Sequence, residues 1–124
     1  MNIVCVYSIE EGVSEEKPLA GWYHVPFGIS YIATSLKLAN HNVKMEVFTA
    51  NTNFERRVSN LITEFKPKML CLTAVTTQFE TILRITEEVK KIDPSIFIVV
   101  GGAHATLNPE QVIGIKTIDA ICIG

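Results

Sequence analysis

The sequence predicts an α/β protein in which one parallel β-sheet lies between two layers of helices. Five short apolar runs alternate with longer segments whose apolar residues recur with helical spacing, and this alternation is typical of a parallel sheet. The third and fourth runs are almost continuously apolar, as strands covered by helices on both faces must be. The predicted strands are residues 3–7, 43–48, 69–74, 96–100 and 118–123.

Three long helices between these strands are predicted from their apolar stripes and their first residues. The first follows Gly28, the second follows Thr52 and the third follows Thr77. Thr52 with Glu55, and Thr77 with Glu80, have the spacing of a capping box, so both threonines are predicted to be N-caps. The stripe of the first helix consists of Ile29, Ile32, Ala33 and Leu36.

A further helix is predicted at Pro109, because Asn108 and Pro109 have the order of an N-cap and a first-turn proline. Right-handed crossovers then leave few topologies, and we expect a doubly wound, flavodoxin-like (Rossmann-like) three-layer α/β/α fold with five parallel strands in the order 2-1-3-4-5. The 124 residues suit one domain, residues 1–124. No helix is predicted after the last strand, so we expect an N-terminal part of a longer protein.

Composition and charge exclude several classes of function. The chain is 48% hydrophobic and has a formal net charge of −2, with acidic and basic residues mixed along it. We therefore expect neither nucleic acid nor a membrane as a partner. The longest apolar runs are far shorter than the roughly 20 residues of a membrane helix, and no signal-peptide pattern opens the chain, so a cytoplasmic protein is expected.

The three cysteines, Cys5, Cys71 and Cys122, each lie within a predicted strand. Thiols in such positions usually behave as small buried hydrophobes, and the chain has no CxxC or Cys/His pair with metal-ligand spacing. All three are predicted to be buried, and no metal site is predicted.

Three loops are candidates for a binding site, because ligands of open α/β sheets bind beyond the carboxyl ends of the strands. The loop at 8–25 far exceeds the usual 2–6 residues, which indicates a lid or binding loop, with a disordered excursion as the alternative. The loop at 73–77 gathers small and hydroxyl side chains, although Thr76 and Thr77 can equally start a helix. In the loop at 101–106, Gly101 and Gly102 either let a ligand approach the backbone or serve a tight turn.

Common nucleotide sites and catalytic sets are missing from the sequence. It has no GxGxxG after the first strand and no GxxxxGK[ST], and the first and third strands end without the acidic residues that magnesium needs in a receiver domain. Ser8, His24 and His104 could meet near the sheet edge, but no G-x-S-x-G elbow or orienting acid accompanies them. No catalytic residues are therefore predicted, and the chain alone is not expected to be an enzyme. Among the histidines, His104 is the candidate to test.

The motifs resemble those of the cobalamin-binding domain at the N-terminus of many radical S-adenosylmethionine enzymes, which include methyltransferases and the anaerobic magnesium-protoporphyrin IX monomethyl ester cyclases. The resemblance covers nearly the whole chain and depends on PFGISYIA at 26–33, TAVTTQ at 73–78, VGGAHAT at 100–106 with NPE at 108–110, and DAICIG at 119–124. Corrinoid domains of this fold typically carry Ser-x-Leu after the third strand and Gly-Gly after the fourth. Residues 73–75 and 101–102 are similar to these.

The resemblance implies a corrinoid cofactor, cobalamin, whose nucleotide tail Thr73, Val75 and Thr76 would line, while Gly101 and Gly102 let the tail or the corrin edge pass close to the backbone. The Asp-x-His-x-x-Gly motif that supplies a cobalt ligand in the methionine-synthase type is absent, as in several radical-enzyme relatives. The predicted cofactor-binding residues are Ser8, Thr73, Ala74, Val75, Thr76, Gly101, Gly102, Ala103 and His104.

The chain also lacks the CxxxCxxC spacing that holds a radical iron–sulfur cluster. Any cluster and S-adenosylmethionine would belong to a C-terminal radical domain, for which this domain would position the corrinoid in methyl transfer or oxidative cyclisation. The alternative is a degenerate module that keeps the fold and serves only as an interface. A free-standing flavin carrier is disfavoured, because no phosphate-binding loop is found.

Overall fold

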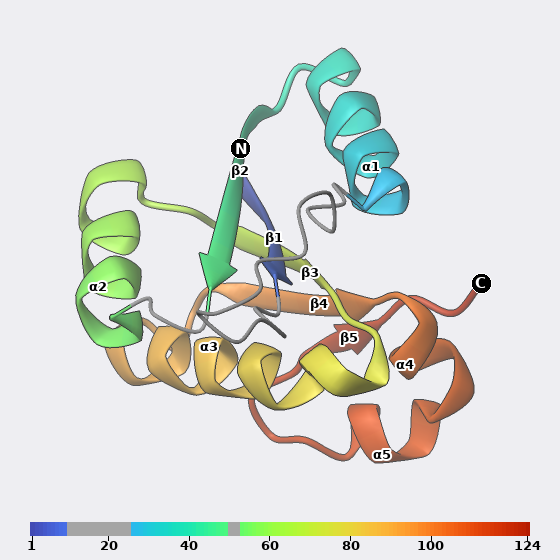
Figure 1. Ribbon diagram of the computed structural model, residues 1–124. Coiled ribbons are helices and arrows are strands. Elements are labelled where there is room, and N and C mark those ends of the chain that lie inside the picture. The colour runs from blue at the N-terminus through green and yellow to red at the C-terminus, as the bar shows by residue number, and fades with distance from the viewer. Residues whose placement is uncertain (10–25, 50–52) are drawn as a thin grey trace, which may run out of the picture.

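The computed structural model confirms the predicted fold class and strand order. It describes residues 1–9, 26–49 and 53–124. The five strands are all parallel and lie in the order β2-β1-β3-β4-β5 (Figure 1). Their bounds are β1 Asn2–Ile9, β2 Asn42–Thr49, β3 Met69–Thr73, β4 Phe97–Gly101 and β5 Ala120–Ile121.

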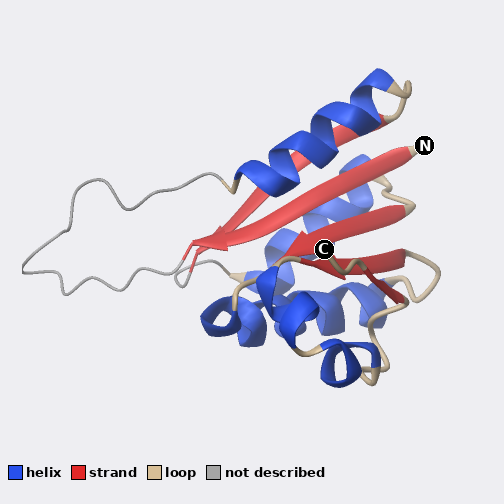
Figure 2. Ribbon diagram, turned by 90° about the vertical axis from the view of Figure 1, so that its right-hand side faces the viewer, coloured by secondary structure: helices blue, strands red, loops and turns tan. Residues whose placement is uncertain are grey.

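Helices cover the two faces of the sheet unequally, as Figures 1 and 2 show together. Helix α1 (Phe27–Leu38) lies on one face, and α2 (Phe54–Phe65) and α3 (Phe79–Ile92) lie on the other. The short helices α4 (Ala103–Leu107) and α5 (Pro109–Ile113) bury residues in the same core as α2 and α3. On the α1 side, therefore, a single described helix faces the sheet.

Alternation along the strands produces two separate apolar clusters, because successive side chains of a strand point to opposite faces. Val4 and Val6 of β1 belong to the large core under α2 and α3, whereas Cys5 and Tyr7 belong to a smaller cluster with Ile29 and Ala33 of α1. All of these side chains are buried. The β1 strand is thus covered on both faces, which explains its nearly continuous apolar sequence.

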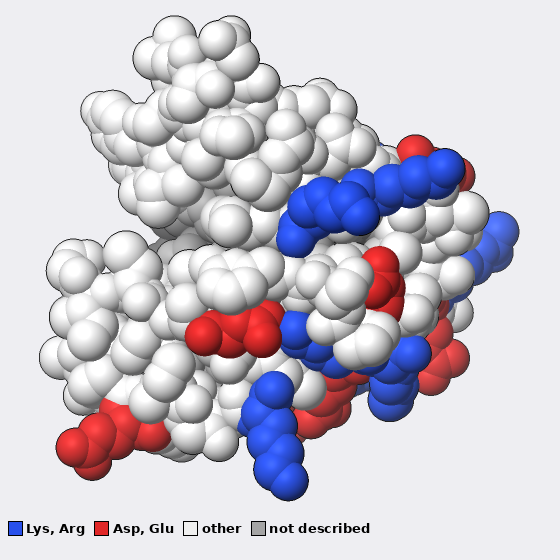
Figure 3. Space-filling view, turned by 180° about the vertical axis from the view of Figure 1, so that it is seen from behind, with Lys and Arg blue, Asp and Glu red and all other residues white. Residues whose placement is uncertain are grey.

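The surface is mixed in sign over the part of the chain that the structure describes. Seen from behind, acidic and basic side chains are interspersed over the right side and the lower part, whereas the upper left, where α1 lies, shows no charged side chain (Figure 3). The outer surface of α1 is instead partly apolar, with Phe27 80%, Tyr31 74% and Leu38 81% exposed. None of the described helices has the length and apolar character that crossing a bilayer requires.

Two of the predicted helix starts are wrong. The N-cap of α2 is Asn53, whose side chain accepts a hydrogen bond from the Arg56 N–H at 3.1 Å, and Thr52 lies outside the described residues. Thr77 is not a cap either, because it lies inside a 3₁₀ turn, Thr76–Gln78, that precedes α3. That turn brings the Gln78 side chain between two partners: its Oε1 accepts from the Val75 N–H, and its Nε2 donates to the Ser8 carbonyl. The predicted order of Asn108 and Pro109 at the start of α5 is confirmed.

The cysteine prediction holds only in part. Cys5 is buried, Cys71 is half-buried and Cys122 is exposed. The strand predicted at 118–123 is paired only at Ala120 and Ile121, so Cys122 lies just beyond the sheet and keeps its solvent contact.

A polar cluster fastens this short edge strand to the rest of the fold. Lys90 Nζ, near the end of α3, donates to the Ile96 carbonyl at 2.9 Å and to Asp119 Oδ2 at 2.7 Å, and the same oxygen accepts from the Ile98 N–H at 2.8 Å. Burial raises the pKa of the Asp119 carboxyl, but the hydrogen bonds from Lys90 and Ile98, with the charge of Lys90, outweigh it and hold that pKa below its usual value. Ionised Asp119 therefore stabilises the fold.

We predict that Asp119→Asn lowers the free energy of unfolding by about 1–2 kcal/mol near neutral pH, because it removes one partner of a charged hydrogen-bonded pair. Since the pKa of Asp119 is lower in the folded state, this difference is present above the unfolded pKa of about 4 and is lost as the pH falls through the folded value. Urea denaturation of both proteins across this pH range measures it. Glu88→Gln, which breaks the exposed pair with Lys91, is the control and should cost less.

Candidate functional site

The loops after β3 and β4 are joined tightly at the carboxyl edge of the sheet. The Ala74 N–H donates to the Gly101 carbonyl at 3.2 Å, and the His104 N–H donates to the Ala74 carbonyl at 3.1 Å. Gly102 lies between them with a φ of +92°. A Cβ at this position would be 2.6 Å from Thr73 Oγ1 and 2.8 Å from the Ala74 carbonyl oxygen. Gly102 is therefore required by the backbone itself, for its left-handed conformation and for the close approach of Thr73.

An apolar groove of about 470 Å³ opens on the α1 side of the sheet. It begins at Thr73 and Gly101, at the carboxyl edge, and follows β3 back to Met69 at the amino end of that strand. Its volume is in the range of about 300–1,000 Å³ that is usual for small-molecule sites. We call it the α1 groove; its lining residues are Gly28, Ile29, Ile32, Leu36, Met69, Cys71, Leu72, Thr73, Val99, Gly101, Gly102, Cys122 and Gly124.

The α1 groove exists because α1 covers only part of its face of the sheet. Ile29 and Ala33 of α1 are buried in the cluster over β1, while Ile32 and Leu36 face the groove. The side chains of Cys71 and Val99, which pair across β3 and β4, remain partly accessible on this face. The groove is thus an apolar stretch of sheet surface beside a single helix.

Three of the predicted site residues line this groove: Thr73, Gly101 and Gly102. Ala74, which follows Thr73, points to the other side and is buried in the large core. Val75 is 46% exposed and Thr76 is exposed, and neither lines the groove. Ser8 is buried at the end of β1, and its hydroxyl has no hydrogen-bond partner among the described residues.

His104 lies away from the groove, on the other face of the sheet. It is the second residue of α4, which starts at Ala103, and it is buried with its ring 4.1 Å from the Phe79 ring of α3. Its Nδ1 shares a hydrogen bond with Thr76 Oγ1 at 3.1 Å, while Nε2 has no partner in the described part of the chain. Its imidazole thus packs between α4 and α3 and does not line the α1 groove.

Sequence reasoning missed the α1 wall of the groove and its thiols. Ile29, Ile32 and Leu36 were recognisable as a helical stripe, but a stripe does not show which strands lie beneath it or how much of them it covers. Gly28, which lines the groove, is one signal of it in the sequence. A Cβ added there would meet nothing within 4 Å, so neither packing nor an unusual φ requires glycine at this position.

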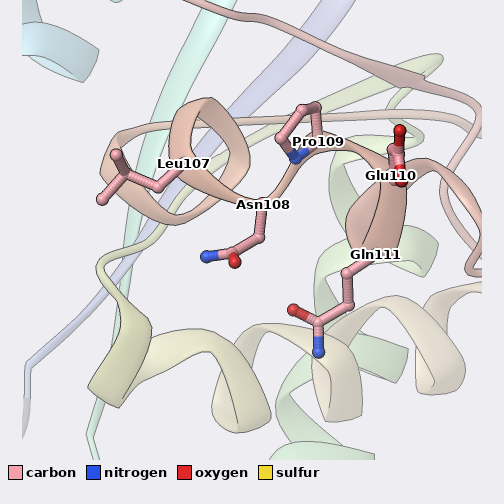
Figure 4. A pocket seen from close by; sticks show the side chains of 5 residues that line it. All are labelled: Leu107, Asn108, Pro109, Glu110 and Gln111. Atoms are coloured by element: carbon pink, nitrogen blue, oxygen red, sulfur yellow. The ribbon is translucent and has the colours of Figure 1, made fainter.

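A second hollow, of about 390 Å³, lies at the junction of α4 and α5 (Figure 4). Its lining residues are Leu107, Asn108, Pro109, Glu110 and Gln111, which are consecutive in the chain. The amides of Asn108 and Gln111 point to the same side, while Leu107 and Glu110 point elsewhere (Figure 4). No other element contributes a lining residue, so this hollow is a bend between two helical turns and a weaker candidate.

The fold and the α1 groove define a flavodoxin-like domain with an apolar groove that reaches the carboxyl edge of its sheet. Residues 20–124 match the family model of the B12 binding domain, and the chain belongs to this family. It is also 28% identical over 94 residues to an uncharacterized methyltransferase of Pyrococcus horikoshii. That alignment covers 76% of this chain and 20% of the relative, so the chain spans about a fifth of the relative's length.

We predict that Gly102→Ala destabilises the fold by about 3 kcal/mol, because the new Cβ adds a clash with Thr73 to an unfavourable φ. Gly101→Ala is the matched control: its Cβ would meet the Cys122 Cβ at 3.4 Å, an ordinary contact, and stability should stay within about 1 kcal/mol. Thermal denaturation of the two variants compares them. Equal stability of the two variants would contradict the backbone role given to Gly102.

Proposed function

We propose that this chain binds cobalamin with the nucleotide tail in the α1 groove and the corrin ring over the carboxyl edge of the sheet. The observation that carries the proposal is the groove itself, an apolar channel that opens at the strand ends where ligands of this fold class bind. Membership in the B12 binding domain family supports the same ligand.

The groove residues fit an elongated tail better than a whole corrin ring. About 470 Å³ accommodates a nucleotide-sized group, and the walls from α1 and the sheet are mostly aliphatic, which suits the aromatic base at the end of the tail. Thr73 brings a hydroxyl to the outer end of the groove, where the more polar part of the tail would pass. Gly28 and Gly101 leave the mouth free of side chains.

In this proposal the chain contributes binding and orientation, and it does not contribute a cobalt ligand. Bound cobalamin would supply a cobalt centre that carries a methyl group or an electron. Gly101 would allow the cofactor to lie against the backbone at the edge, and Ile32 and Leu36 would exclude water from the tail. His104 would act as part of the scaffold, because its ring packs against Phe79.

We further propose that the chain is part of a longer protein in which a radical S-adenosylmethionine domain, with its own iron–sulfur cluster, performs methyl transfer or oxidative cyclisation. Two observations support this: the resemblance of the 26–33, 73–78 and 100–106 motifs to such proteins, and the match of the chain to only 20% of a relative named as a methyltransferase. The exposed apolar residues of α1, Phe27 and Tyr31, offer a contact surface close to the groove.

We predict that the protein retains about one equivalent of hydroxocobalamin after gel filtration and that Gly28→Trp weakens this binding about tenfold or more, which corresponds to about 1.4 kcal/mol or more. The indole would occupy the groove without disturbing the fold, since a Cβ at position 28 meets open space. Visible absorbance of the eluted protein measures the retained corrinoid. Thr34→Trp places the same side chain on an exposed position of α1 outside the groove and is the matched control.

Equal loss in both tryptophan variants, or none in either, would contradict the placement of the tail in the α1 groove. A wild-type protein that elutes colourless would overturn corrinoid binding by this chain and favour the degenerate interface module. In the retained complex, the band positions should be those of a corrinoid without a protein imidazole on cobalt.

The proposal of a longer protein makes a separate prediction. Sequencing of the transcript past the codon for Gly124 should reveal an open reading frame that encodes a CxxxCxxC segment, because three cysteines at this spacing hold the radical cluster. A stop codon directly after Gly124 would refute the radical domain in the same chain and leave the corrinoid proposal untouched.

A further inference from the structure

Two cysteines face each other directly across the centre of the sheet. Cys5 of β1 and Cys71 of β3 are partners in the parallel register, and both belong to the small cluster beneath α1. Each thiol shifts the pKa of the other. The α-carbons of partner residues on neighbouring strands are about 4.8 Å apart, which lies within the range of about 4.4–6.8 Å found in disulfides. The α-carbon separation is thus compatible with a covalent bond between the two sulfurs.

The two thiols differ in access. Cys5 is fully buried, under Ile29 and Ala33 of α1, whereas Cys71 is half-buried and lines the α1 groove. A small reagent in the groove can therefore reach Cys71 and cannot reach Cys5. This difference gives the pair a defined order of reaction.

A hydrogen bond between the two thiols would make the accessible thiol the more acidic one. Donation from Cys5 lowers the pKa of the Cys71 thiol despite partial burial. The same hydrogen bond, together with burial and repulsion from a Cys71 thiolate, raises the pKa of Cys5. The thiolate, which is the nucleophile, thus forms on the residue that faces the groove, and the proton stays on the residue behind it.

We propose that Cys5 and Cys71 form a redox-active dithiol, which a small disulfide entering the α1 groove converts to an intramolecular disulfide. Cys71 is the attacking residue and Cys5 is the resolving residue. The inference concerns the thiols of this chain alone and does not depend on corrinoid binding.

The reaction proceeds in two exchanges. Ionised Cys71 bonds to one sulfur of the small disulfide and displaces the other sulfur as a thiolate, which takes up a proton from solvent. The Cys5 sulfur then attacks the Cys71 sulfur and displaces the second small thiolate, which takes up the proton that Cys5 gives up. The two protein thiols are oxidised, and the small disulfide is reduced to two thiols.

The Cys5–Cys71 disulfide would be readily reversible. The Cβ atoms of partner residues on parallel strands point the same way and stay about 4.8 Å apart, beyond the roughly 3.5–4.5 Å usual in disulfides, and disulfides of unusual geometry are more easily reduced. Its formation would tie β1 to β3 under α1 and replace the thiol that Cys71 presents to the groove. The oxidised and reduced forms would therefore differ at the floor of the α1 groove.

The test uses 4,4′-dithiodipyridine, an aromatic disulfide that releases a coloured pyridinethione for each thiol it oxidises, with no corrinoid added. Exposed Cys122 reacts by itself, so all proteins carry Cys122→Ser. The protein with both remaining cysteines should release two equivalents and lose the mass of two hydrogens. Adding Cys5→Ser should leave one equivalent released and a mixed disulfide on Cys71, and adding Cys71→Ser should nearly abolish release.

Release of two equivalents with two adducts in place of an intramolecular bond would overturn the proposal, as would rapid reaction of Cys5 in the protein with Cys71→Ser. Circular dichroism verifies that each variant is folded. If a serine in the apolar cluster prevents folding, Cys5→Ala and Cys71→Ala provide the same comparison without a buried hydroxyl. Dithiothreitol should restore both thiols of the oxidised protein.

Discussion

A parallel sheet must bury both of its faces, and the described helices of this chain cover those faces unequally. Helices α2 and α3, with α4 and α5, close one face over a continuous core that includes Val4, Leu70 and Ile98. Helix α1 stands alone on the other face, above β1. Among the described residues, the large core holds most of the buried apolar side chains, and part of the α1 face stays uncovered. The α1 groove is a consequence of this division.

The carboxyl edge of the sheet is where the two sides of the molecule meet. Ala74 and His104 secure the loops after β3 and β4 to each other on the α3 side, and Thr73 and Gly101 face the groove on the α1 side. Gly102 allows the loop after β4 to pass close to Thr73 and Ala74, because a Cβ at this position would clash with both. Core residues and groove residues therefore alternate along this short stretch, because neighbouring positions of an extended chain point to opposite faces.

The fold was predictable from the sequence because it depends on strong, repeated signals. Five apolar runs, the periodic stripes between them and right-handed crossovers are enough to predict the strand order that the structure has. Helix starts were less predictable, because the caps at Thr52 and Thr77 were predicted from local spacing alone. In the structure, Asn53 is the N-cap of α2, and a 3₁₀ turn precedes α3 at Phe79. Local motifs compete with tertiary contacts such as that between Gln78 and the Ser8 carbonyl, which no short pattern encodes.

The candidate-site residues at the carboxyl edge of the sheet were predictable from the sequence, and the residues deeper in the α1 groove were not. Thr73, Gly101 and Gly102 follow from the rule that ligands meet the carboxyl ends of strands. Other features depend on which elements are neighbours in space, which no local pattern shows. They are the α1 wall of the groove, the register pair of Cys5 and Cys71, and the contact of His104 with Phe79. Of the loop at 8–25, predicted as a lid or binding loop, residues 8 and 9 belong to β1 and residues 10–25 lie outside the described residues.

The two edge strands of the sheet, β2 and β5, differ in length, and each disfavours pairing with a strand of a second molecule in its own way. β5 pairs through only two residues, so it offers a second molecule almost no backbone to extend. β2 is eight residues long, but Lys44 and Glu46 place charges along its middle, where the two side chains pair at 2.9 Å. An incoming strand would have to bury those charges, and both borders of the sheet are thereby protected against edge-to-edge aggregation.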